Sequence, residues 1–293
     1  MHLGAAKNLI AVDIGNSRIK IGQFDRARMY GAPAATQSPS AHSLPEPVCT
    51  LDLPVANATG AFDTTRLRAW CDQRASSQSE WLVASVHRRA AETLDATLRN
   101  FVTQAGDRCA IRHLTYRDIP LDIQVDEPAR VGIDRLLAAF AANRLRSRQR
   151  AAVIVDLGTA VTVDLLTAAG AFAGGAILPG IAMSARALAE QTDGLPLVVL
   201  DALEQPPSAL GKSTVPAIQA GLYWGPVGAI RELVRQLSAG LSPPPEMFVT
   251  GGASPRVGEL LAIDGDSPVH HVPHLVLAGI ALVDASAPCR GGG

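Results

Sequence analysis

One short pattern occurs twice in this chain, and the repeat limits the possible folds more than any other feature. The apolar run at 9–12 leads into the sequence DIGNS at 13–17, and 143 residues further on the run at 153–155 leads into DLGTA at 156–160. A second β-prone run follows each copy directly. Each copy therefore predicts a β-hairpin, with a tight polar turn that can bring backbone N–H groups up to a phosphate.

Two hairpins of this kind indicate the fold class. Such turns, facing each other across a cleft, are typical of the actin-like, sugar-kinase and Hsp70-type ATPases. We therefore predict an α/β protein of two ribonuclease-H-like (actin-like ATPase) domains with a cleft between them, and 293 residues suit two cores of about 150 residues each. We place the N-terminal domain at 1–131 and the C-terminal domain at 132–293. The Pro-, Ser- and Ala-rich stretch at 31–48 is expected to be a flexible loop, by default a spacer without chemistry.

The composition excludes several classes of partner. The formal net charge is −1, from 26 basic and 27 acidic residues, which gives no field suited to nucleic acid or to a membrane surface. No stretch approaches the ~20 apolar residues of a membrane span, charged residues interrupt the start of the chain, and the 4 cysteines have no C-x-x-C spacing. We therefore expect a cytoplasmic protein with free thiols that binds neither nucleic acid nor membranes.

The apolar spacing also predicts the elements between and after the hairpins. Helices are expected at 64–75, 90–104, 130–140, 183–191 and 278–285, and strands at 80–86, 110–114, 174–180 and 247–250. The long helical region at 214–237 contains Gly225 and Pro226, where we expect it to break into two helices.

An acidic residue stands near the end of each repeated strand, Asp13 in the first and Asp156 in the second. In isolation such a residue is usually a turn former or a helix cap. Here each has a glycine two positions on and a matching context, so we favour a role in phosphoryl transfer, which needs a cation held near the phosphates. Asp13 then fits as a holder of Mg²⁺, directly or through another ligand, and Ser17 and Lys20 could reach the phosphates.

The sequence GIDR at 132–135 is the candidate acceptor site. A carboxylate beside an arginine is usually a surface salt bridge. Here Asp134 opens an apolar helix immediately before the second repeated strand, so it would project toward the same site as the turns. Asp134 would take the proton of an attacking hydroxyl, and Arg135 could bind an anionic substrate or the transferring phosphoryl group.

Two other motifs do not fit the sites that their residues first suggest. The sequence GKST at 211–214 looks like the end of a P-loop, but Pro206 stands where that motif requires glycine. His270, His271 and His274 lie close together, but a zinc site would need further ligands, so we read them as surface or strand-end residues.

In their order along the chain, these motifs resemble those of the type III pantothenate kinases, members of the actin-like kinase superfamily that includes the Bvg accessory factor proteins. The matching motifs are D-x-G-N-S at 13–17, S-V at 85–86, G-x-D-R at 132–135, D-x-G-T-A-x-T-x-D at 156–164, G-G-x-I-x-P-G at 174–180, L-P at 195–196, G-K-S-T at 211–214, A-I-Q-A-G at 217–221 and T-G-G at 250–252. Each motif alone is weak, but the ordered set is strong.

The resemblance implies a reaction and its ligands: ATP phosphorylates pantothenate in the first step toward coenzyme A, with Mg²⁺ and a monovalent cation, K⁺ or NH₄⁺, as cofactors. The nucleotide-binding residues that it implies are Asp13, Ile14, Gly15, Asn16, Ser17, Arg18, Ile19, Lys20 and Thr159. The pantothenate-binding residues that it implies are Gly132, Ile133, Asp134, Arg135 and Thr214, with Asp134 as the catalytic base. It assigns the monovalent cation to Asp156.

The resemblance also implies a homodimer in which Thr214 reaches the partner's acceptor site. The helix beginning at Thr214 carries a stripe that suits such an interface, formed by Ala217, Ile218, Gly221 and Leu222 and followed by Trp224. The alternative is burial of this stripe within its own domain. The chain departs from the family at Val125, where many members have a substrate-contacting tyrosine, which predicts a more apolar or rearranged edge of the pantothenate pocket.

Two other functions stay open on the residues alone. One is a non-catalytic regulatory protein that binds nucleotide on the same fold, although Asp134 would then have no use as a base. The other is an actin-like kinase that acts on a different small hydroxyl substrate, which only the family resemblance excludes.

Overall fold

The computed structural model describes residues 8–30, 43–75, 79–105, 110–200, 205–252 and 268–286. The chain forms two compact units: the first comprises Met1–Leu145 and His274–Gly293, and the second comprises Arg146–Pro273. Most of the predicted loop at 31–48 lies outside the described residues, and its described part, 43–48, has no regular structure before the strand that follows.

The first unit is built on a five-stranded sheet in the order β3-β2-β1-β4-β5. Its strands are β1 (Asn8–Ile14), β2 (Arg18–Asp25), β3 (Cys49–Pro54), β4 (Ser79–Ser85) and β5 (Ala110–His113). β2 is antiparallel to β1 and to β3, whereas β4 is parallel to β1 and to β5. The first predicted hairpin is therefore confirmed, and it lies at the centre of the sheet.

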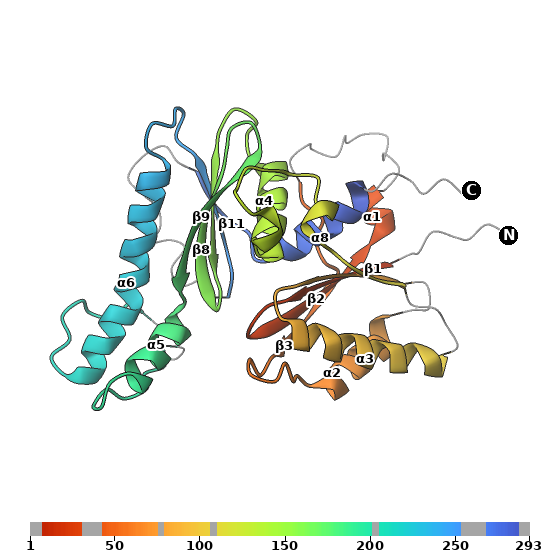
Figure 1. Ribbon diagram of the computed structural model, residues 1–293, viewed down its shortest axis with the longest axis horizontal. Helices are drawn as coiled ribbons and strands as arrows, with labels where there is room; N and C mark the ends of the chain where they lie inside the picture. Colours follow the sequence, from red (N-terminus) through yellow and green to blue (C-terminus); the bar gives the residue numbers. More distant parts are fainter. Residues whose placement is uncertain are drawn as a thin grey trace. The chain divides into compact units, whose positions relative to one another are not determined.

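Helices cover both faces of this sheet (Figure 1). The alternating side chains of Ile10, Val12 and Ile14 pack against α2 (Thr64–Arg74) and α3 (Arg88–Ala105). On the other face lie α4 (Ile133–Leu145) and α8 (Leu275–Ser286), and α8 is apolar on nearly all sides, as expected of a helix enclosed by protein. The short elements of this unit are α1 (Arg26–Tyr30), η1 (Tyr116–Asp118), β6 (Asp122–Ile123) and η2 (Pro128–Arg130).

The division of the chain differs from the expected boundary after residue 131. α4 belongs to the first unit, because it packs against α8 and β4. The two helices cross in near contact at Gly279, where an added Cβ would lie 2.3 Å from the carbonyl oxygen of Leu137. The sequence around 274–286 predicts a helix but carries no local signal that this helix returns to the first unit.

The second unit repeats the architecture of the first. Its strands are β7 (Ala152–Leu157), β8 (Ala160–Leu166), β9 (Ala171–Pro179), β10 (Glu246–Thr250) and β11 (Val269–His271). They follow the order β9-β8-β7-β10-β11, with β7–β8 and β8–β9 antiparallel and β7–β10 and β10–β11 parallel. Each strand thus has a counterpart in the first unit, so the sequence repeat corresponds to a structural repeat.

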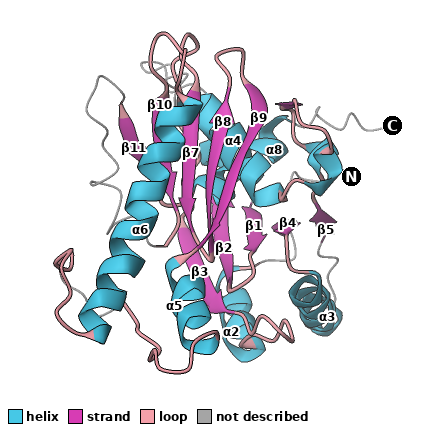
Figure 2. Cartoon of the chain, turned by 60° about the vertical axis from the view of Figure 1, so that its left-hand side comes forward, coloured by secondary structure: helices cyan, strands magenta, loops and turns pink. Residues whose placement is uncertain are grey.

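α5 (Ile181–Glu190) and α6 (Thr214–Leu237) cover one face of this second sheet (Figure 2). The predicted break at Gly225 and Pro226 is wrong, because α6 is a single helix with Pro226 inside it. Its buried stripe continues across the proline, with Tyr223 before it and Val227 after it in the same core. Packing against the sheet therefore keeps the helix continuous although Pro226 lacks an N–H group.

The other predicted helices and strands are confirmed, most with ends shifted by only a few residues. No helix in the described part of the chain is both long and apolar enough to cross a lipid bilayer.

Candidate functional site

The first hairpin turn brings the chain back on itself within three residues. The N–H of Gly15 donates to the carbonyl of Arg18 at 2.9 Å, which closes the turn between β1 and β2. An added Cβ on Gly15 would lie 3.3 Å from that carbonyl, so the turn is tight for any side chain. Asp13 lies one position before the end of β1 and pairs in register with Lys20 of β2, so the two side chains share a face of the sheet.

The second hairpin turn is shorter by one residue. The N–H of Gly158, the counterpart of Gly15, donates to the carbonyl of Ala160 at 3.1 Å, two residues on rather than three. Asp156 is paired in register with Thr162 of β8 and with Thr250 of β10. Each turn is therefore closed by a hydrogen bond from the N–H of its glycine, but the two turns differ in length by one residue.

Gly251, which follows β10 directly and lies beside the end of β7, is a residue to which the sequence analysis gave no role. Its φ is 95°, a left-handed conformation that favours glycine, and an added Cβ would lie 2.4 Å from Oδ1 of Asp156. The backbone after β10 therefore packs directly against the Asp156 carboxylate. The signal was present as the T-G-G motif after a strand, but only the parallel pairing of β10 with β7 relates it to Asp156.

Asp134 lies in the first turn of α4. Its Oδ1 accepts a hydrogen bond from the N–H of Arg135 at 2.8 Å, and an added Cβ on Gly132 would lie 2.6 Å from the same oxygen. Burial raises the pKa of the Asp134 carboxyl, with the Arg135 N–H and the Arg135 charge opposing this effect. A partly dehydrated carboxylate with a raised pKa is a better proton acceptor than an exposed one.

Within the first unit, Asp134 is connected to the first hairpin turn by contacts through Gly132 and Val86. The same Cβ position on Gly132 is 3.7 Å from a methyl group of Val86. The N–H of Val86 donates to the carbonyl of Ile14 at 3.0 Å, immediately before the turn. The structure therefore brings the candidate base and the residues at 13–20 to one edge of one sheet.

Of the other predicted site residues, Thr159 and Thr214 belong to the second unit, whereas Val125 belongs to the first. Thr159 lies in the turn between β7 and β8, and its carbonyl accepts a hydrogen bond from the N–H of Gly180 at 3.1 Å. Thr214 is exposed at the first position of α6. Val125 lies in the irregular segment between β6 and η2.

His274 lies immediately before α8 in the first unit. Burial and the nearby charge of Lys20 lower the pKa of His274, so its imidazole is held neutral at neutral pH. His270 instead lies on β11, contacts the Glu246 carboxylate at 3.1 Å and stacks on Phe248, as expected of a strand-end residue. No group of three metal-ligating side chains occurs in the described part of the chain.

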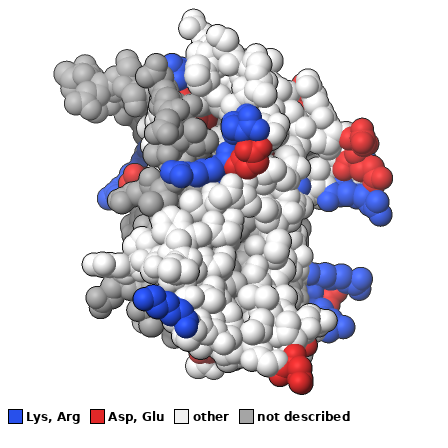
Figure 3. Space-filling view, turned by 90° about the vertical axis from the view of Figure 1, so that its left-hand side faces the viewer, with Lys and Arg blue, Asp and Glu red and all other residues white. Residues whose placement is uncertain are grey.

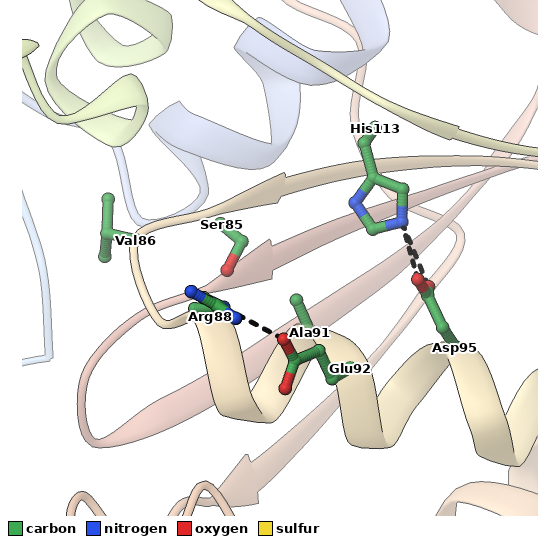
Figure 4. A pocket seen from close by; sticks show the side chains of 7 residues that line it. All are labelled: Ser85, Val86, Arg88, Ala91, Glu92, Asp95 and His113. Atoms are coloured by element: carbon green, nitrogen blue, oxygen red, sulfur yellow. Dashed lines mark hydrogen bonds and ion pairs between the residues drawn. The ribbon is translucent and has the colours of Figure 1, made fainter.

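An open depression of about 500 Å³ lies beside α3 (Figure 4). It is lined by Ser85, Val86, Arg88, Ala91, Glu92, Asp95 and His113. Its charged groups are paired, with Arg88 on Glu92 at 2.9 Å and His113 on Asp95 at 3.0 Å. Because these side chains already have partners, we assign no ligand to the depression.

Comparison with known proteins points to the same family that the sequence motifs resemble. A family model described as type III pantothenate kinase matches residues 9–236. A type III pantothenate kinase of Rhodopirellula baltica is 34% identical over 287 residues, which cover 94% of this chain and 97% of that relative. One of Dehalococcoides mccartyi (strain CBDB1) is 31% identical over 266 residues, which cover 87% of this chain and 88% of the relative.

Among solved structures, the crystal structure of a putative 2-dehydro-3-deoxygalactonokinase from Sinorhizobium meliloti has a TM-score of 0.54 at 12% identity. The match covers 96% of this chain and 99% of that chain. At this identity the likeness shows a shared fold only, and it agrees with the predicted actin-like architecture.

Proposed function

Because this chain belongs to the type III pantothenate kinases, which use ATP to phosphorylate pantothenate in coenzyme A synthesis, we propose roles in that reaction for the residues of the two turns and of α4. Asp134 is the catalytic base, and the residues at 13–20 bind ATP. The observation that carries the proposal is the partly buried Asp134 carboxylate beside Gly132. Val86 lies next to Gly132 and donates a hydrogen bond to Ile14, directly before the first turn.

The Asp134 carboxylate accepts the proton of the pantothenate hydroxyl as that oxygen attacks the terminal phosphorus of ATP, while the bond from this phosphorus to the bridging oxygen breaks and ADP leaves. Removal of this proton makes the oxygen a better nucleophile, and the raised pKa of Asp134 favours its uptake. Gly132 lets the carboxylate pack against the backbone, because any larger residue would place a Cβ 2.6 Å from Oδ1. Arg135 is the cation beside the base and would bind the anionic end of pantothenate or the phosphoryl group.

The kinase family uses ATP together with a divalent metal. The residues present fit this requirement, because Asp13 and Ser17 offer the carboxylate and hydroxyl oxygens that Mg²⁺ prefers. Bound Mg²⁺ neutralises charge on the phosphates. Arg18 and Lys20 supply positive charge next to the same turn, and Thr159 of the second turn would contact the nucleotide as well. We place the reaction in the cytoplasm, where ATP is available.

Asp156 is proposed to hold a monovalent cation. A carboxylate beside ATP would repel its phosphates unless a cation lay between them. Gly251 supports this role, because only glycine lets the backbone approach within reach of the Asp156 oxygen while the chain turns with φ of 95°.

Initial rates of ATP consumption test this assignment. With pantothenate and Mg²⁺, we expect the rate in K⁺ or NH₄⁺ buffer to exceed the rate in Na⁺ buffer about tenfold or more at equal ionic strength, which corresponds to about 1.4 kcal/mol of transition-state stabilisation. A panel of sugars in place of pantothenate should give only the background rate. Equal rates in Na⁺ and K⁺ would exclude a functional monovalent site at Asp156.

A homodimer is proposed from the exposed side of α6. Ile218 and Leu222, expected at the interface, are instead part of the core of the second unit. The stripe on the exposed side keeps Ala217, Gly221 and Trp224 of the expected set and also includes Thr214 and Gly228. Its spacing of three and four residues is that of a helix–helix seam, and its small members would permit close approach.

The surroundings of this stripe support the same proposal. Figure 3 shows that the face containing α6 has few charged groups. Large apolar side chains are exposed in the second unit at Ile177, Leu197, Val199, Leu210 and Val215. Exposed apolar side chains are typical of an interaction site where they gather on one surface. Because Thr214 is the first residue of the stripe, a symmetric dimer through α6 would carry it onto the partner subunit, as the family resemblance implies.

Light scattering and subunit mixing test the dimer and the shared site separately. A mass near that of one chain at micromolar concentration would refute the dimer. Thr214→Ala chains are then mixed with Asp134→Asn chains. If sites are shared, each mixed dimer has one site with both substitutions and one with neither, so activity should recover to about a quarter of the wild-type value for random mixing. No recovery, with subunit exchange confirmed, would mean that each site is built from one chain.

A further inference from the structure

Charged side chains alternate across three strands of the first unit, beside the first hairpin turn. The strand register pairs Asp13 of β1 with Lys20 of β2, and Lys20 with Asp52 of β3. Directly opposed side chains in antiparallel strands share one face and have Cβ atoms about 5 Å apart. Lys20 therefore lies between two carboxylates, one from each neighbouring strand.

The two oxygens of Asp52 differ in their surroundings. Oδ2 accepts a hydrogen bond from the guanidinium of Arg18 at 3.0 Å. Oδ1 is buried, and among the described residues it has no hydrogen-bond partner. A buried acceptor without a partner is costly, and Lys20 is the cation directly opposite Asp52 in the sheet. The arrangement indicates that Oδ1 is the oxygen available to the Lys20 ammonium.

We propose that Asp52 is a positioning residue for ATP binding, which holds Arg18 through one carboxylate oxygen and Lys20 through the other. The carboxylate fixes two long, flexible cationic side chains beside the phosphate-binding turn. It also offsets the repulsion between the two cations, which lie two residues apart on the same face of β2. This inference rests on the proposed assignment of residues 13–20 to ATP.

Whether loss of the Asp52 charge weakens or tightens ATP binding is decided by Asp13. In the absence of the Asp52 charge, Asp13 is the carboxylate that remains opposite Lys20 in register. The ammonium would then pair with Asp13, and it would neutralise the carboxylate proposed to hold Mg²⁺ while moving away from the phosphates. If Asp52 merely competed with ATP for Arg18, its neutralisation would have the opposite effect and tighten ATP binding.

Steady-state kinetics of Asp52→Asn test the inference. We expect KM for MgATP to rise about 5- to 10-fold, kcat to stay within about 2-fold, and half-saturating Mg²⁺ to rise, since the chemistry at Asp134 is untouched. The Asp52 side chain is 45% exposed, so the variant should fold, which a melting curve checks. Asp52→Glu keeps the carboxylate and should hold KM within about 3-fold of the wild-type value.

The control is Glu92→Gln, which removes the carboxylate of another exposed ion pair in the same unit, with Arg88 at 2.9 Å. It should leave KM for MgATP unchanged. An unchanged or lower KM in Asp52→Asn, or equal losses in Asp52→Asn and Asp52→Glu, would overturn the inference. Arg18→Ala and Lys20→Ala distinguish failure of the Asp52 role from failure of the ATP assignment. If neither variant raises KM for MgATP, the assignment of the turn to ATP fails as well. If these two variants raise KM but Asp52→Asn does not, only the role of Asp52 is removed.

Discussion

Replacing Asp134 with asparagine is expected to lower kcat on the order of 10²–10⁴-fold, the range typical of the loss of a general base. Asparagine keeps the size of the side chain and can still accept from the Arg135 N–H, which is 2.8 Å from Oδ1 in the wild-type protein. It cannot take a proton from the pantothenate hydroxyl. ATP binding should be largely retained, so the loss appears in kcat and is measured with saturating substrates.

The pH dependence of the wild-type enzyme's activity provides a second test of the role of Asp134. The base must be ionised to act, and burial raises its pKa above the ordinary aspartate value of 3.8. The acid limb of kcat/KM should therefore lie at higher pH than an exposed aspartate would give, with activity lost as pH falls through it. This limb should be absent from the residual activity of Asp134→Asn.

The matched control is Asp63→Asn at the N-cap of α2. Asp63 accepts a hydrogen bond from the N–H of Arg66 at 2.9 Å, and asparagine serves as well as aspartate at this position. This variant should have wild-type kcat. A near-normal kcat in Asp134→Asn would show that another group, or no group, accepts the proton.

Replacing Gly279 with alanine should destabilise the first unit by about 2–3 kcal/mol, a typical cost of overpacking. The added Cβ would lie 2.3 Å from the Leu137 carbonyl oxygen and 2.8 Å from its carbon, and these are backbone atoms that cannot rotate away. α4 and α8 must therefore separate. We expect Tm to fall by about 5–10 °C in calorimetry, and kcat to fall as well because α4 carries Asp134.

Gly225→Ala makes the same exchange in α6, where an added Cβ meets nothing within 4 Å apart from its chain neighbours. Alanine has the higher helix propensity, but its Cβ would lie against the ring of Pro226, so the two effects oppose each other and the stability should change by less than about 1 kcal/mol. If Gly279→Ala melted like Gly225→Ala, the close crossing of α4 and α8 would be contradicted.

The sequence predicts well those features whose signal lies within one helix or strand and the turn that follows it. The run into Asp13, the glycine two positions on and the β-prone run that follows identify a hairpin without any distant information. The same holds for the second hairpin and for the apolar spacing of α4, which places Asp134 in its first turn.

The features that the sequence misses depend on partners distant in the chain. Pro226 predicts a break, but the core side chains on either side of it hold α6 together. Gly251 contacts Asp156 only because β10 lies parallel to β7, and Asp52 lies beside Lys20 only because β3 pairs with β2. None of these pairings has a local sequence signature. The residues that support the proposed site therefore cannot be identified from sequence motifs alone.

The path of the chain through the two units has a consequence for synthesis on the ribosome. Residues 146–273 form a continuous unit, whereas the first unit is completed by α8, which is translated after all of them. The second unit can thus finish folding while β1 and α4 still lack the helix that covers them. During that interval their apolar faces are open to other nascent chains or to a chaperone, and the enzyme's yield depends on how quickly α8 reaches them.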